Sequence, residues 1–183
     1  IPALQGNDTE GKVIYLGTFS RAIAPSIRIS YMVLPPELMA AFREKLGFYA
    51  CTVSAFEQYT LAQFLAGGWY EKHLSRMRKH YRQKRDTVIA AVHQSPLAPY
   101  AAITEEDAGL HFLLRLDGAP PDEMLRREAE QRGIRLAMLS DYYQCPQDAP
   151  QHVLVVNYTG IDLDRLPAAL ERLAALWKEN DHV

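Results

Sequence analysis

Two short apolar runs near the start of the chain predict a pair of buried β-strands. The runs Val13–Gly17 and Ser30–Leu34 are rich in β-branched and aromatic residues, and glycine or proline bounds them. The segment between the two runs is a polar loop. The first side chains suited to chemistry therefore lie where two strands are joined.

Three helices are predicted to follow these strands. The pair Pro35-Pro36 suits a first helical turn, so a helix opens there and continues over Glu37–Leu46. A second helix begins at Ser54, which forms a capping box with Glu57 three residues later. From Trp69 to about Gln94 there is no glycine or proline, and apolar residues recur three or four positions apart. This spacing predicts one long amphipathic helix.

The second half of the chain has the pattern of a small α+β domain. The order β-β-α-β-β-α after Pro96 predicts helices that cover one face of a sheet. We therefore divide the chain into residues 1–96, which include the long connecting helix, and residues 97–183. The predicted strands are Ala101–Thr104, Leu110–Leu116, Ile134–Leu139 and Val153–Tyr158, and the predicted helices are Asp122–Arg132 and Leu163–Lys178.

The composition is that of an ordinary globular protein. The 183 residues are 48% hydrophobic and 23% charged, and 20 basic against 22 acidic side chains give a net charge of −2, which argues against a chain specialised for polyanions. No apolar stretch approaches the ~18 residues of a membrane-spanning helix. Cys51 and Cys145 lie far apart without CxxC spacing, which favours a reducing, cytoplasmic location. The first residues have no signal-peptide pattern and are typical of a cut inside a longer protein.

Basic residues are concentrated on the long helix. Seven of them fall between Lys72 and Arg85. They indicate either a phosphate-binding stripe or a solvated helix face, and the acidic balance of the whole chain favours the solvated face. The helix also carries His73 and His80, but no carboxylate at ligand spacing accompanies them, so no metal site is predicted.

The loop between the first two strands carries the residues most suited to binding an anion. It places the hydroxyls of Thr18 and Ser20 and the guanidinium of Arg28 in one turn. Hydroxyls donate neutral hydrogen bonds, and a guanidinium adds a bidentate charged pair to a phosphate. On these residues alone, a plain surface loop is the simpler interpretation, because Ser, Thr and Arg are common in loops.

The same segment resembles a known family. The run GTFS-x-x-x-x-P-x-x-R-x-x-Y, from Gly17 to Tyr31, is similar to the cofactor-lysine region of fold-type I, pyridoxal-phosphate-dependent aminotransferases. It is most similar to the aminotransferase-like domains of MocR-type regulators, a branch of the GntR transcription factors. The segments Ile1–Gly6, Gly109–His111 and Leu139–Tyr143 also have counterparts there. The resemblance implies an α/β fold: the end of the large aminotransferase-like domain, followed by the small α+β domain.

The resemblance also implies site residues. The family residues that match Thr18, Ser20 and Arg28 hold the phosphate of pyridoxal 5'-phosphate, and the residue that matches Arg21 is the Schiff-base lysine. Arginine cannot replace that lysine, because its guanidinium stays protonated and offers no lone pair to the aldehyde. Three alternatives remain open. The native residue is lysine, the protein binds the cofactor non-covalently, or it has lost the cofactor.

Two functions follow from the resemblance. The first is an effector-sensing domain of a MocR/GntR-type regulator, catalytically impaired by Arg21, which pairs as a homodimer and reaches DNA only through a winged-helix domain outside this chain. Its ligand is a small-molecule effector or amino acid. The alternative is a fragment of a class I/II aminotransferase, a transferase acting on an amino acid. The substrate-carboxylate arginine of many such enzymes is replaced here by Val155, and Arg115 is expected at the surface.

Overall fold

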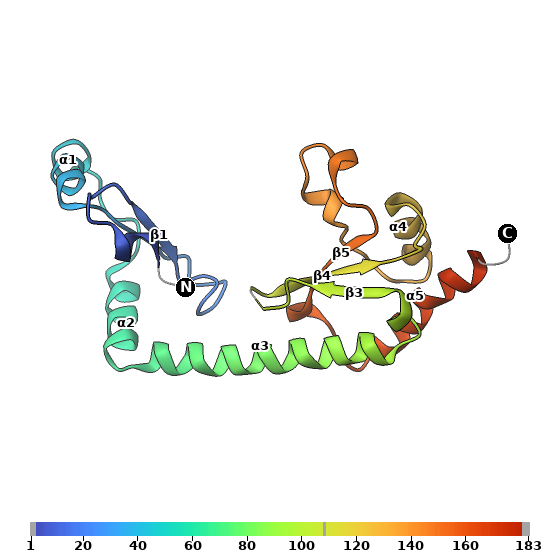
Figure 1. The fold of residues 1–183 in the computed structure, drawn as a ribbon. Helices are drawn as coiled ribbons and strands as arrows, with labels where there is room; N and C mark the ends of the chain where they lie inside the picture. The colour runs from blue at the N-terminus through green and yellow to red at the C-terminus, as the bar shows by residue number, and fades with distance from the viewer. Residues whose placement is uncertain (1–2, 108, 181–183) are drawn as a thin grey trace. The chain divides into compact units, whose positions relative to one another are not determined.

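The structure is a computed structural model that describes residues 3–107 and 109–180, and the backbone forms two compact units, Ile1–Met77 and Arg78–Val183 (Figure 1). Helix α3 runs through the division between them. The domain boundary predicted from the sequence lies at residue 96, just after the end of this helix. It stays a prediction about the domains of the complete protein. Among the described helices, none combines the length and apolar composition that crossing a bilayer requires.

The N-terminal unit consists of a hairpin and helices. Strands β1 (Tyr15–Thr18) and β2 (Ser30–Val33) pair antiparallel, and α1 (Pro36–Leu46), α2 (Ala55–Ala66) and the start of α3 (Trp69–Gln94) follow. These helices agree closely with the predicted ranges because their starts carry local signals. The predicted cap of α2 is present, since its serine hydroxyl accepts the N–H of the glutamate three residues on at 3.2 Å.

The prediction that the first two strands are buried is wrong for the described residues. Leu16 of β1 is 71% exposed and Met32 of β2 is 44% exposed. Within the described N-terminal unit, the only residues in the buried class are Ile29 and Pro35, and neither belongs to the two strands. A two-stranded sheet has too little area to bury both of its faces, so apolar side chains of these strands stay exposed in this structure.

The C-terminal unit contains the hydrophobic core. Strands β3 (Ala101–Thr104), β4 (His111–Leu116) and β5 (Val153–Asn157) form an antiparallel sheet in the order β3-β4-β5. Buried residues alternate along β4 and share one core with residues of α3, α4 (Asp122–Gln131) and α5 (Leu166–Asn180). The largest fully buried side chains are Phe112, Leu97, Leu116, Leu125, Met138, Leu176, Val88 and Val92.

The predicted strand Ile134–Leu139 is wrong. It forms only an isolated β-bridge, between Met138 and Leu154, and then enters a 3-10 turn at Leu139–Tyr142. The bridge is held by the N–H of Val155, which donates to the Ala137 carbonyl at 2.8 Å. Directly after it, the Asp141 carboxylate accepts the N–H of Met138 at 3.0 Å and caps the 3-10 turn, so the chain turns where a strand would continue.

Candidate functional site

The turn between β1 and β2 brings together two of the predicted phosphate-binding residues. Thr18 ends β1 and Ser20 lies two residues on, with their hydroxyl oxygens 3.3 Å apart. The backbone N–H of Ser20 also donates to the Thr18 hydroxyl at 3.3 Å. The chain turns directly after Thr18, since the Phe19 carbonyl accepts the N–H of Ala22 at 3.1 Å and the N–H of Ile23 at 2.8 Å.

Both hydroxyls are engaged with the returning backbone. The Thr18 hydroxyl donates to the Ile29 carbonyl at 3.2 Å, and the Ser20 hydroxyl donates to the Ile27 carbonyl at 2.5 Å. Each hydroxyl has one proton. In this arrangement the hydroxyls hold the turn closed, and donation to a phosphate requires each hydrogen to rotate away from its carbonyl.

The two arginines of the turn supply its charge. Arg21 and Arg28 are both exposed, and within the described part of the chain neither makes a hydrogen bond or an ion pair. The sequence from Thr18 to Tyr31 contains no acidic residue, so the turn carries two uncompensated positive charges. This donor set fits a phosphate dianion, because guanidinium groups bind phosphate bidentately. It does not fit a covalent link to an aldehyde at position 21.

Aromatic rings and a histidine support the turn. The ring of Phe19 lies 5.1 Å from that of Tyr31 and 5.8 Å, edge-on, from that of Tyr70. Nε2 of His73 lies 2.9 Å from the carbonyl oxygen of Ala22. No sequence pattern indicates this contact of His73 with Ala22, since the two residues are 51 positions apart. The phenol of Tyr31 has a raised pKa, because it is hydrogen-bonded to another tyrosine side chain and partly desolvated.

The positions that the resemblance linked to substrate lie in the C-terminal unit. Val155 pairs with Leu113 in the middle of β5, and its N–H donates to the Ala137 carbonyl at 2.8 Å. Arg115 is exposed, as predicted, and pairs with Asp117 at 3.0 Å. Neither side chain provides an unpaired cation for a substrate carboxylate.

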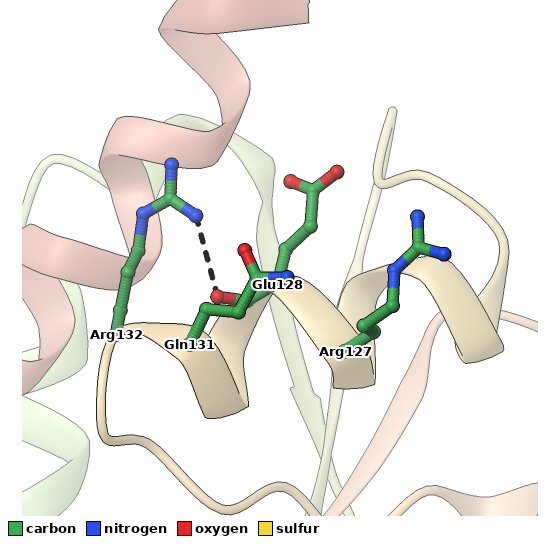
Figure 2. Close-up of a pocket in the computed structure, with 4 residues that line it drawn as sticks. All are labelled: Arg127, Glu128, Gln131 and Arg132. Atoms are coloured by element: carbon green, nitrogen blue, oxygen red, sulfur yellow. Dashed lines mark hydrogen bonds between the residues drawn. The ribbon is translucent and has the colours of Figure 1, made fainter.

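A hollow of about 370 Å³ lies along the end of α4 (Figure 2). Its walls are the side chains of Arg127, Glu128, Gln131 and Arg132, and the Arg132 guanidinium donates to the Glu128 carbonyl at 3.3 Å. The carbonyls at the end of a helix disfavour anions, and the two arginines disfavour cations. We assign this hollow no ligand.

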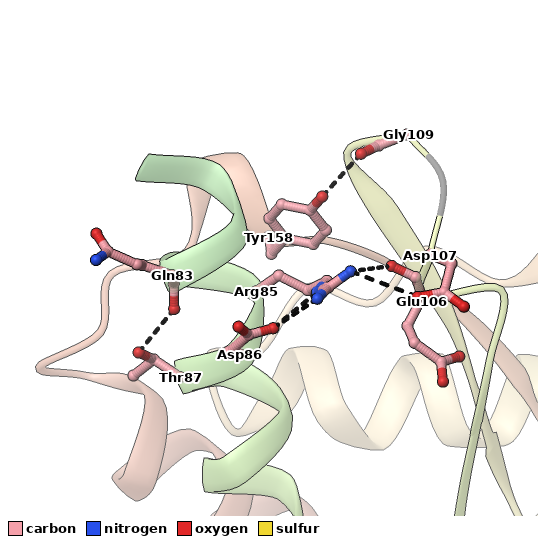
Figure 3. Close-up of polar contacts among 8 residues, drawn as sticks. All are labelled: Gln83, Arg85, Asp86, Thr87, Glu106, Asp107, Gly109 and Tyr158. Carbon is pink, nitrogen blue, oxygen red and sulfur yellow. Dashed lines mark hydrogen bonds and ion pairs between the residues drawn. The ribbon is translucent and has the colours of Figure 1, made fainter. Parts of the chain in front are cut away.

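A polar cluster fastens α3 to the sheet of the C-terminal unit (Figure 3). Arg85 pairs with Asp86 at 2.8 Å, which raises the pKa of the guanidinium, and it donates to the Glu106 carbonyl at 2.8 Å. The Tyr158 hydroxyl donates to the Gly109 carbonyl at 2.8 Å, and burial raises the pKa of this phenol. Every partner is internal, so the cluster is structural.

The described residues include no group of three or more His, Cys, Asp or Glu side chains placed to hold a metal ion.

Comparison with known proteins finds relatives among bacterial regulators. No protein-family model matches the chain. It is 37% identical over 178 residues to the uncharacterized HTH-type transcriptional regulator YdeL of Bacillus subtilis, covering 97% of this chain and 38% of YdeL. It is 37% identical over 163 residues to the probable rhizopine catabolism regulatory protein MocR of Rhizobium meliloti, covering 88% of this chain and 32% of MocR. The chain thus spans less than two fifths of the length of these relatives.

Aminotransferases are among the solved structures with a similar backbone. The kynurenine aminotransferase of Pyrococcus horikoshii matches with a TM-score of 0.74 and 27% identity, over 98% of this chain and 44% of that one. The multiple substrate aminotransferase of Thermococcus profundus matches with a TM-score of 0.73 and 22% identity, over 96% of this chain and 43% of that one.

Proposed function

Because the chain is homologous to MocR-type HTH regulators over their aminotransferase-like portion, we propose that it is the effector-sensing domain of a transcriptional regulator of this kind. The resemblance to this family and the α/β fold of the fold-type I aminotransferases are both confirmed. In the complete protein, residues 1–96 and 97–183 are the end of the large domain and the small domain. The regulator acts in the cytoplasm as a homodimer.

The ligand of the β1–β2 turn is pyridoxal 5'-phosphate, held non-covalently by its phosphate. The observation that carries this assignment is the pair of exposed, unpaired guanidiniums of Arg21 and Arg28 on a turn without acidic residues. Arg28 binds the phosphate, and Thr18 and Ser20 keep the turn in the shape that presents it. When bound, the cofactor supplies an aldehyde that reacts with amines. Arg21 adds charge to the site but cannot take the place of a lysine nucleophile.

Sensing requires that the two states of the domain bind the effector with different affinity. A small molecule, or an amino acid, that occupies the site together with the cofactor favours one arrangement of the domain. An HTH portion outside this chain then binds DNA differently. The coupling is reciprocal, so DNA that favours the same arrangement tightens effector binding by the same factor.

Calorimetry with the complete gene product tests the phosphate site. Titration with pyridoxal 5'-phosphate is expected to show that Arg28→Ala weakens binding about 10- to 100-fold, since a hydrogen bond to a charged group contributes about 1.5–3 kcal/mol. The matched control is Arg43→Ala, an exposed arginine of α1, which should leave the affinity unchanged. Equal affinities of Arg28→Ala and the unmodified protein would remove Arg28 from the site.

A second candidate function is transamination of an amino acid. It is favoured by the 27% identity to the kynurenine aminotransferase of Pyrococcus horikoshii. Against it stands Arg21, which provides neither the nucleophile nor the general base that lysine provides in such sites. The sequence of the gene upstream of this chain separates the two. An HTH-coding segment supports the regulator, and a short N-terminal arm supports the enzyme.

A further inference from the structure

Positive charge is concentrated in one part of α3, and the rest of the chain is acidic. The segment from Lys72 to Arg85 holds seven of the 20 basic residues and no acidic one. This leaves 13 basic against 22 acidic residues elsewhere, a net charge of −9 outside the segment. Such a concentration of one sign creates a local field that the small overall charge of −2 hides.

Part of this basic segment is used inside the C-terminal unit. Lys84 donates to the carbonyl of Thr159 at 2.9 Å. Arg85 is held by Asp86 and by the β3–β4 loop, as Figure 3 shows. These two cations face the core side of the helix, next to Tyr81, which packs against the core. Their charges are therefore not available to a partner.

Three other cations of the same unit are left exposed. Arg78, Lys79 and Arg82 are all in the exposed class, and within the described residues none of them makes an ion pair or a hydrogen bond. Arg78 and Arg82 are four residues apart, and Lys79 and Arg82 are three apart. Side chains at these spacings are neighbours on one helix face. We call these three residues the basic row.

We propose that the basic row binds the phosphate backbone of duplex DNA. This inference rests on the proposed function, in which the complete protein is a DNA-binding regulator. It goes beyond that function because the proposed function places DNA contact only in an HTH portion outside this chain. Lysine and arginine side chains on an exposed helix face, without carboxylates among them, match a line of phosphates, which carries one negative charge per ~1.7 Å of duplex. The row reads no bases, so its contribution is independent of sequence.

The proposal is tested with the complete gene product and a labelled duplex of random sequence. The variant is Arg78→Gln/Lys79→Gln/Arg82→Gln. The matched control is Arg43→Gln/Lys45→Gln/Arg135→Gln, which removes the same charge from exposed positions elsewhere. Affinities are measured by fluorescence anisotropy between about 50 and about 200 mM salt, a range over which phosphate contacts weaken strongly. Circular dichroism confirms that both variants are folded.

The expected result is a shallower salt dependence for the basic-row variant only. Three lost phosphate contacts reduce the slope of log K against log salt by about 2.7, so the affinity ratio across this fourfold salt range falls about 40-fold. An unchanged salt slope for the basic-row variant overturns this proposal but does not contradict the proposed regulator function. An equal loss in the control variant also overturns it, because general charge then explains the binding.

Two further outcomes are distinguishable. Absence of DNA binding by the unmodified protein refutes both the regulator and the basic row. If the variant keeps the salt slope but loses self-association in sedimentation experiments, the row contacts an acidic surface of a second copy, and the DNA proposal is wrong.

Discussion

Asp122 is predicted to be the most important polar residue for stability in the C-terminal unit. Its side chain is buried, with 6% of the residue exposed, at the first turn of α4. One carboxylate oxygen accepts from the Ser140 hydroxyl at 2.8 Å, and the other accepts from the His152 backbone N–H at 2.7 Å. Asp122 thus joins the start of α4, the 3-10 turn and the residue before β5.

The cost of removing this carboxylate can be worked from its contacts. Each hydrogen bond to a charged group contributes about 1.5–3 kcal/mol, and a negative charge at a helix N-terminus adds about 0.3–1 kcal/mol. His152 also has φ +63°, a left-handed conformation that costs about 1 kcal/mol or more and is held by its hydrogen bond to Asp122. We expect Asp122→Ala to lower the free energy of unfolding by about 3–5 kcal/mol.

Urea denaturation followed by far-ultraviolet circular dichroism measures this change. The matched control is Glu123→Ala, since Glu123 is the next residue of the same helical turn but its side chain is 89% exposed. The control should change the stability by no more than about 0.5 kcal/mol. Asp122→Asn keeps one acceptor and should lie between the two. If Asp122→Ala unfolds within about 1 kcal/mol of the unmodified chain, the buried carboxylate does not hold these segments together.

Two other predictions concern the same unit. Phe112→Ala should lower the free energy of unfolding by about 3–5 kcal/mol, because the ring of Phe112 is fully buried. The control Phe56→Ala, at a residue that is 80% exposed, should change it little. Equal losses of free energy in urea denaturation would contradict the placement of the core. Burial raises the pKa of Tyr158 above its ordinary value of 10.0, so its neutral form contributes stability that is complete below about pH 10 and is lost as the pH rises through the raised pKa. Unfolding measured against pH should therefore show a smaller alkaline loss for Tyr158→Phe than for the exposed control Tyr142→Phe, and parallel curves would refute this linkage.

Local signals made the helices predictable. Pro35-Pro36 and the Ser54–Glu57 capping box fix where two helices start, and both depend only on neighbouring residues. The strand predicted at Ile134–Leu139 failed because its alternation of apolar and polar residues is shared by irregular segments that lie along a sheet. The next residues form a 3-10 turn in which the Asp141 carboxylate accepts the N–H of Met138, and the apolar pattern gives no information about this turn.

The candidate site shows the same limit. The sequence predicted that Thr18 and Ser20 share one turn, and their hydroxyls lie 3.3 Å apart. The carbonyl partners of the hydroxyls and the contact of His73 with Ala22 depend on how the chain returns in space. The exposure of β1 and β2 could not be predicted from their apolar residues either. Apolar composition shows that a strand is suited to burial, but it does not show whether another surface covers the strand.

The most direct test of the proposed cofactor site replaces the one residue that departs from the family. Arg21→Lys, introduced into the complete gene product, places an amine where the resemblance puts the Schiff-base lysine. After incubation with pyridoxal 5'-phosphate and borohydride, mass spectrometry of the digested protein should find the reduced adduct on the peptide that contains residue 21. The unmodified protein should give no adduct there. If the variant carries no adduct at residue 21, or carries it only on other lysines, the β1–β2 turn is not a pyridoxal phosphate site.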